Sequence, residues 1–205
     1  MHDADKAKAW FVADIGGTYT LQLKVSDGTD TDTDDITVTA EVQTIGSIDQ
    51  NTTLKDVFAD PTKTDYMVSG TSYITADLTI EPGVRIMFAD GAELNVSTGG
   101  SVKAIGTETD SIVFTGAQKS AGYWDGISVG SNNPSNELQY CVIEYGGKSY
   151  GNVYANSSGQ VTLHNNTIQH SGNYGVYKAS TATINPTNWQ TVNTVTDNPN
   201  GVINP

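Results

Sequence analysis

The chain has 205 residues, with 23 Asp and Glu against 10 Lys and Arg, a formal net charge of −13 and 21 glycines. With a single arginine, Arg85, and many Thr, Ser, Asn, Asp and Gly residues, the composition speaks against a helical protein and favours an all-β fold. So few basic residues give no source of phosphate neutralisation, and neither nucleic acid nor an anionic membrane surface is expected as a partner.

Residues 1–42 contain two expected strands. Residues 18–25 and 36–39 alternate apolar and polar side chains with period two, and residues 26–28, Ser-Asp-Gly, have turn chemistry. This pattern predicts a hairpin-like pair, which is only marginally stable without further strands.

The stretch A-D-I-G-G-T-Y-T-L-Q-L-K-V-S-D-G in residues 13–28, continued by the acidic run and I-T-V-T-A, resembles the end of a PKD-type, immunoglobulin-like domain of extracellular proteins. The earlier strands of that family are absent from this sequence. The resemblance therefore implies that residues 1–42 are the remnant of such a domain, and we expect the chain to have been cut from a longer multidomain protein.

Carboxylates alternate at Asp30, Asp32 and Asp34, the spacing that D-x-D-x-D-G calcium loops use. Asp35 stands where such a loop has its glycine, and no glutamate follows at the twelfth position. We expect a solvated face or hairpin tip here, with weak Ca²⁺ binding as the alternative.

Residues 43–65 show no sustained period and are predicted to be a linker or N-terminal cap. From residue 66, short apolar triplets alternate with Gly, Asn, Asp and Pro turns, and residues 138–145 repeat as residues 163–170. A period near 25 built from strands and turns predicts a β-solenoid of five to six coils over residues 66–205. The Asn- and Pro-rich tail from residue 185 is expected to cap the C-terminal end of this solenoid. Leu138 should stack on Leu163 and Ile143 on Ile168 inside the solenoid. Cys141 should lie next to Asn166 at a turn between strands.

This part closely resembles the right-handed parallel β-helix, pectin-lyase-like repeat region of secreted bacterial proteins. The resemblance rests on L-T-I-E-P-G-V at 78–84, G-S-V-K-A-I-G-T at 100–107, Y-W-D-G-I at 123–127, and I-E-Y-G-G at 143–147. It implies a short single-stranded right-handed β-helix and an extracellular or cell-surface location. It does not imply one activity, since the fold hosts lyases, hydrolases, adhesins and phage spikes.

Enzymes of that family need clustered aspartates with a histidine and an Arg-x-Lys pair, or a Ca²⁺-binding acidic cluster with a base. No two acids of the solenoid are adjacent in sequence, and Arg85 stands alone; the acids are Asp77, Glu81, Asp90, Glu93, Glu108, Asp110, Asp125, Glu137, Glu144 and Asp197. We therefore predict no catalytic residues and no cofactor. A polysaccharide lyase or glycoside hydrolase is the alternative.

Three aromatic residues mark successive repeats, each one or two residues before a glycine: Trp124, Tyr150 and Tyr174. Flat rings flanked by polar partners suit sugars, whose apolar faces stack while their hydroxyls form hydrogen bonds. The predicted carbohydrate-binding residues are these three rings with Asp125, Asn152 and Asn173. The alternative is that the rings fill the coil.

The lone cysteine, Cys141, permits no intramolecular disulfide and is predicted to be a small ladder residue. His164 and His170 are expected at turn or surface positions rather than at a metal. The resulting prediction is a non-catalytic extracellular or cell-surface module that binds a polysaccharide, a surface glycan or another surface partner. A structural spacer or assembly module is a further alternative.

Overall fold

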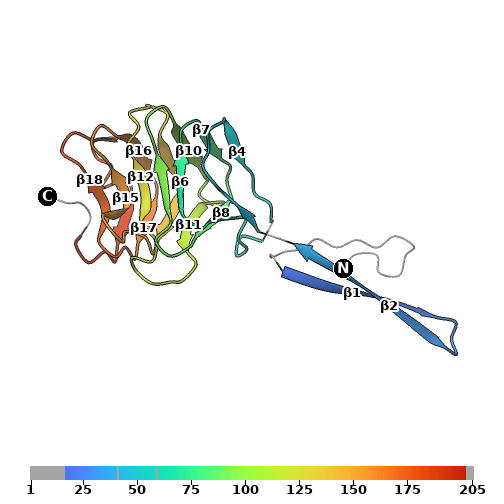
Figure 1. Cartoon of the computed structure of the whole chain (residues 1–205). Coiled ribbons are helices and arrows are strands. Elements are labelled where there is room, and N and C mark those ends of the chain that lie inside the picture. The colour runs from blue at the N-terminus through green and yellow to red at the C-terminus, as the bar shows by residue number, and fades with distance from the viewer. Residues whose placement is uncertain (1–16, 41, 59, 202–205) are drawn as a thin grey trace. The chain divides into compact units, whose positions relative to one another are not determined.

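A computed structural model describes residues 17–40, 42–58 and 60–201 (Figure 1). All of its regular elements in that part of the chain are β-strands, which confirms the predicted all-β class. The chain divides into two units, Met1–Val42 and Gln43–Pro205, and each is described by itself. Within the described residues, no helix is long and apolar enough to cross a membrane.

The N-terminal unit contains an antiparallel hairpin of β1 (Gly17–Ser26) and β2 (Thr31–Ala40). Asp27 closes its turn, because its Oδ1 accepts the amides of Thr29 and Asp30 at 2.9 and 2.8 Å. The predicted strand pair and turn are therefore present. Apolar side chains of both strands are exposed, as expected of two strands that have no second layer among the described residues of their own unit.

The second unit is a right-handed parallel β-solenoid of about six turns built from three sheets. The first sheet consists of β3 (Gln43–Thr44), β5 (Tyr66–Val68), β8 (Arg85–Phe88), β11 (Ile112–Gly116), β14 (Cys141–Glu144), β17 (Thr167–Gln169) and β20 (Thr194–Thr196). The second sheet consists of β6 (Thr71–Ile74), β9 (Glu93–Val96), β12 (Gly126–Val129), β15 (Gly151–Ala155) and β18 (Tyr174–Lys178).

The third sheet consists of β4 (Thr52–Leu54), β7 (Asp77–Ile80), β10 (Ser101–Ile105), β13 (Glu137–Gln139), β16 (Gln160–His164) and β19 (Thr183–Asn185). From β5 onward the chain visits the first, second and third sheets in that order, turn after turn. Every neighbouring strand pair of the three sheets is parallel, so equivalent residues of successive turns lie side by side.

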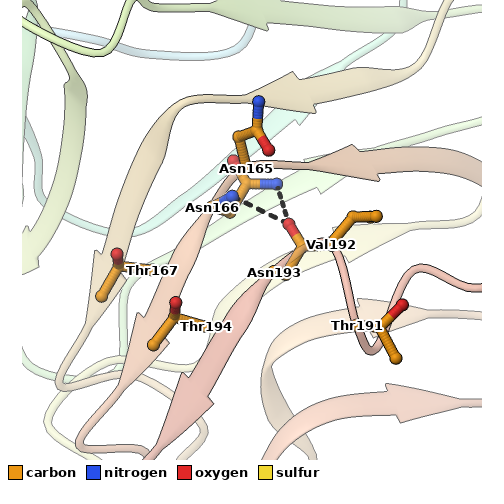
Figure 2. A pocket seen from close by; sticks show the side chains of 7 residues that line it. All are labelled: Asn165, Asn166, Thr167, Thr191, Val192, Asn193 and Thr194. Carbon is orange, nitrogen blue, oxygen red and sulfur yellow. Dashed lines mark hydrogen bonds between the residues drawn. The ribbon is translucent and has the colours of Figure 1, made fainter.

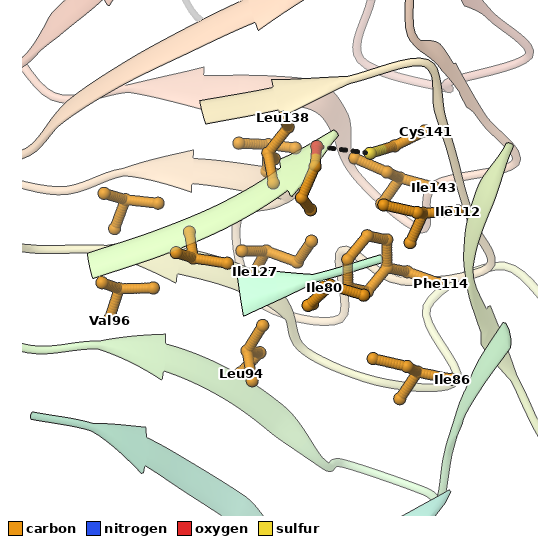
Figure 3. Close-up of a cluster of buried hydrophobic side chains, with 14 of the residues drawn as sticks. Ile80, Ile86, Leu94, Val96, Ile112, Phe114, Ile127, Leu138, Cys141 and Ile143 are labelled. Carbon is orange, nitrogen blue, oxygen red and sulfur yellow. Dashed lines mark hydrogen bonds between the residues drawn. The ribbon is translucent and has the colours of Figure 1, made fainter. Parts of the chain in front are cut away.

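The core lies between the three sheets and consists of apolar ladders (Figure 3). Alternate side chains of each strand point inward, as the burial of Leu78 and Ile80 against exposed Asp77 and Thr79 illustrates in β7. Inward positions of successive turns then stack in register as Ile80–Ala104–Leu138–Leu163, Ile86–Phe114–Ile143–Ile168 and Leu94–Ile127–Val153–Val176. The 25-residue offset and its two predicted apolar pairs are confirmed.

The buried Asn166 and the half-buried Asn193 hold the turns between the third and first sheets (Figure 2). Asn166 Oδ1 accepts the Cys141 amide at 2.9 Å, and Asn166 Nδ2 donates to the Leu138 carbonyl at 2.7 Å and to Asn193 Oδ1 at 2.9 Å. The predicted pairing of Cys141 with Asn166 is present. The Cys141 thiol is buried, and burial raises its pKa, so this cysteine is a ladder residue rather than a nucleophile.

The two ends of the solenoid contain more regular structure than the sequence predicted. Residues 43–65, expected to be a linker or cap, contribute β3 and β4, which pair in parallel with β5 and β7 and so begin the solenoid itself. The tail contributes β20 and Trp189, whose side chain is only 4% exposed and joins the core.

Candidate functional site

Trp124 does not lie on an outer face. Its side chain is completely buried and stacks on Phe88, with ring centroids 3.9 Å apart and an angle of 12° between the rings. The indole Nε1 donates to the Glu144 carbonyl at 2.9 Å, and Gly146 lies so close that a Cβ there would be 3.0 Å from the ring. Trp124 therefore fills the coil, as in the alternative interpretation of the aromatic residues. It is not available to bind a sugar, and its assignment to the sugar-binding site is wrong.

Asn152 is also buried, and its side-chain amide forms three hydrogen bonds inside the fold. Its Oδ1 accepts the Gly146 amide at 2.8 Å, while its Nδ2 donates to the carbonyls of Ile143 and Gln169 at 3.1 and 2.7 Å. Because both of its donors are used and the side chain is buried, Asn152 is a structural residue and not part of a surface site.

Four tyrosines form a cluster on the outer face of the second sheet: Tyr150, Tyr154, Tyr174 and Tyr177. Tyr150 stacks on Tyr154 with centroids 4.3 Å apart, and Tyr177 contacts Tyr150, Tyr154 and Tyr174 edge-on at 5.2, 5.4 and 5.6 Å. Tyr150 is 45% exposed and the other three are half-buried. Of the predicted rings, the structure thus brings together Tyr150 and Tyr174.

Tyr154 and Tyr177 were not predicted as site residues, although a sequence signal for them exists. Each follows a buried valine, Val153 or Val176, so strand alternation turns both tyrosines outward, and the parallel register places them side by side. Alternation within a strand therefore identifies these two rings, whereas the spacing of aromatic residues from glycines does not.

A groove of about 220 Å³ borders this cluster; we call it the tyrosine groove. It is lined by Glu93, Asp125, Ser128, Ser149, Tyr150 and Tyr154. Ser149 Oγ donates to Asp125 Oδ1 at 2.8 Å, which fixes the predicted Asp125 carboxylate at the wall. Burial, and secondarily the nearby charge of Asp125, raises the pKa of Glu93 above its usual value.

Asn173 lies next to the groove rather than in it. Its Nδ2 donates to the Ser149 carbonyl at 3.0 Å, and its Oδ1 accepts a hydrogen bond from Asn200 Nδ2 at 2.5 Å. Asn173 therefore holds the loop that carries Ser149 and Tyr150, and it acts on the groove only through that loop.

The calcium prediction for Asp30, Asp32 and Asp34 is not supported. Asp32 and Asp34 belong to β2, whose extended backbone separates alternate residues by about 6.6 Å and does not wrap them around an ion. In the described part of the chain, no group of three or more His, Cys, Asp or Glu side chains could hold a metal ion.

The two histidines of the last repeat are also apart from the groove. His170 stacks on Tyr145 with centroids 5.2 Å apart. His164 lies on the third sheet, where its Nδ1 is buried without a hydrogen-bond partner among the described residues. Neither belongs to a group of metal-ligating side chains in the part of the chain that the structure describes.

A family model described as a pectate-lyase-like beta helix domain matches residues 46–174, well over half of the chain. The match begins in the segment that the structure assigns to the first turn of the solenoid and covers all but its last turns. Comparison with curated proteins and with solved structures gave no match.

Proposed function

The chain belongs to the pectate-lyase-like β-helix family, and within that family we propose that it is a carbohydrate-binding module whose tyrosine groove holds part of a glycan. The observation that carries this proposal is the contact of four tyrosine rings beside two carboxylates on one outer face. Tyrosine offers an apolar face for a sugar ring and a hydroxyl at its edge, while Asp125 and Glu93 can accept hydrogen bonds from sugar hydroxyls.

The size of the groove bears on how a glycan would bind. At about 220 Å³ it is smaller than the pockets of roughly 300–1,000 Å³ that enclose whole small molecules. It therefore suits one sugar unit of a longer chain, with neighbouring units lying on Tyr174 and Tyr177. A polysaccharide or cell-surface glycan is accordingly the partner that we propose.

Replacing Tyr150 or Tyr177 by alanine is expected to weaken glycan binding at least about fivefold each, since one stacked aromatic contact contributes about 1 kcal/mol. A glycan array followed by affinity electrophoresis with the best polysaccharide measures this. Tyr73→Ala is the matched control, because Tyr73 is 51% exposed on the same sheet but has no ring contact with the cluster. Unchanged binding by the Tyr150 and Tyr177 variants, or no binding of any polysaccharide, contradicts the proposal.

A second candidate function, glycoside hydrolysis, is favoured by the raised pKa of Glu93 beside Asp125. A carboxyl that stays protonated can act as general acid while its neighbour remains ionised. Because the folded-state pKa of Glu93 is raised, the protonated form persists to higher pH than usual and is lost as the pH rises through that raised value.

Incubation of the protein with polygalacturonate or alginate, followed by an assay for new reducing ends, tests whether it hydrolyses glycosides. If hydrolysis occurs, Glu93→Gln is expected to abolish it, and the activity of the parent protein should fall as the pH rises. Glu108→Gln, a change at an exposed glutamate outside the groove, should leave the rate unchanged. Absence of reducing ends, or full activity of Glu93→Gln, would remove hydrolysis from consideration and leave binding alone.

We further propose that the protein acts outside the cell or at its surface, and that the β1–β2 hairpin is the closing strand pair of a PKD-type domain. The sequence resemblance of residues 13–40 and the apolar side chains left exposed on the hairpin support this. Protease treatment of intact cells tests the location, since an internal protein would be protected.

A further inference from the structure

A second cavity, distinct from the tyrosine groove, lies on the outer face of the first sheet. Its volume is about 310 Å³, and three successive turns contribute to it: Thr62 and Thr64 precede β5, Arg85 begins β8, and Lys119 follows β11. The sequence does not predict that these residues lie close together, because Arg85 and Lys119 are far apart in the chain. The solenoid brings them to one site.

Neither cation of this cavity has an ionic partner among the described residues. The Arg85 guanidinium is held by one hydrogen bond, from its Nε to the Pro61 carbonyl at 3.1 Å, and its other nitrogens contact no acceptor among the described residues. Lys119 forms neither a hydrogen bond nor an ion pair in the described part of the chain. By contrast, Lys148 pairs with Asp90 at 2.8 Å.

No carboxylate of the described residues lines this cavity, although the chain carries 23 acidic residues. The buried Asp65 carboxylate lies behind Arg85, and its oxygens accept the amides of Val57, Phe58 and Arg85 at 2.9, 3.0 and 2.7 Å. Two further carboxylates stand beside the wall, because Asp60 and Glu144 accept the hydroxyls of the lining residues Thr62 and Thr115. The described lining itself therefore carries two cations and no anion, with carboxylates hydrogen-bonded at its edge.

The threonine hydroxyls differ in what they can offer a ligand. Thr62 donates its hydroxyl to Asp60 at 2.7 Å and Thr115 donates to Glu144 at 3.0 Å, so neither has a proton to spare. The Thr64 hydroxyl forms no such bond with a described residue. The available donors are thus the Arg85 fork, the Lys119 ammonium and the Thr64 hydroxyl.

We propose that this cavity binds a small oxyanion group, a sulfate, phosphate or carboxylate, between Arg85, Lys119 and Thr64. A guanidinium fork presents two parallel donors to two oxygens of such a group, and the ammonium supplies a second charge. The overall charge of −13 opposes anion binding, so the expected affinity is weak, in the millimolar range. The proposal concerns a different sheet from the tyrosine groove and does not depend on glycan binding there.

Titration of the full chain with sodium sulfate, sodium phosphate and sodium glucuronate, followed by amide ¹⁵N–¹H spectra, tests the proposal. Sodium chloride at equal ionic strength is the reference. Saturable shifts at Thr64, Arg85 and Lys119 are expected with at least one oxyanion, and the one bound most tightly identifies the group. Shifts that do not saturate, or that chloride reproduces, would overturn the site.

Lys119→Gln should weaken the oxyanion about tenfold, because it removes one charge-assisted contact. Since Lys119 has no partner in the described fold, this variant should keep the melting temperature of the parent. Lys103→Gln is the matched control: it removes the same charge at an exposed position of the third sheet and should leave binding unchanged. Equal weakening by both variants would mean that only net charge matters, and it would refute a defined site.

Discussion

Replacing Trp124 by alanine is expected to lower the free energy of unfolding by about 3–5 kcal/mol, the range for removing a large buried aromatic side chain. The loss has two parts. The ring leaves a cavity against Phe88 and Gly146, and the Glu144 carbonyl loses its donor. Urea denaturation followed by circular dichroism measures the change.

Two further variants separate these contributions. Trp124→Phe retains a ring for Phe88 but loses the indole donor, so its loss should be smaller than that of the alanine variant, about 1–3 kcal/mol. Tyr73→Ala, at an exposed ring, should change stability by no more than about 0.5 kcal/mol. A loss below about 1 kcal/mol in Trp124→Ala would show that the ring is not the packed core residue described above.

Asn166→Asp is expected to destabilise the solenoid by about 3 kcal/mol at neutral pH, although the two side chains have almost the same shape. The Leu138 carbonyl and Asn193 Oδ1 each lose a donor and face a carboxylate oxygen instead. Figure 2 shows the Asn166 side chain directed at Asn193 Oδ1. Burial among acceptors raises the folded-state pKa of the new carboxyl above the usual Asp value of about 3.9.

The sign of the pH dependence follows from that rise. Below pH of about 4 the carboxyl is protonated in both states and can donate one hydrogen bond, so the destabilisation is smallest there. As the pH rises through the raised folded-state pKa, the loss grows. Denaturation curves of the parent and the variant at pH of about 3.5 and about 7 measure how the destabilisation changes with pH.

Asn165→Asp is the control for this prediction. The neighbouring Asn165 is exposed, and its side-chain amide points away from Asn193. Its left-handed backbone, with φ of 56°, is one that aspartate also adopts. This change should alter stability by at most about 0.5 kcal/mol. A similar loss from both variants would mean that added charge, and not the buried amide, decides the effect.

The sequence was sufficient to predict the solenoid because the inward residues of successive turns are of one chemical kind. Leu138 stacks on Leu163 and Ile143 on Ile168, so a constant offset of 25 residues is visible without any structure. The first turn was missed for the opposite reason. Strands β3 and β4 have two and three residues, too short for a period, and only their pairing with β5 and β7 identifies them.

The candidate site was predicted only in part, because a shared sequence mark does not fix the direction of a side chain. Trp124 precedes Asp125-Gly126, and Tyr150 precedes Gly151. Even so, the Trp124 side chain points inward, where Gly146 leaves room for it, whereas that of Tyr150 points outward. The cavity around Arg85 and Lys119 has no sequence signal at all, since its residues come from three different turns.

The stacking of Trp124 between neighbouring turns has a consequence for how the solenoid unfolds. The ring contacts Phe88 of the preceding turn and the backbone of Glu144 in the following one, and it therefore couples three consecutive repeats. In a protein where each repeat contacts only its neighbours, cooperativity is transmitted through such nearest-neighbour links. Weakening this link in mid-chain should divide one cooperative transition into two, whereas damage in a terminal repeat should only fray that end.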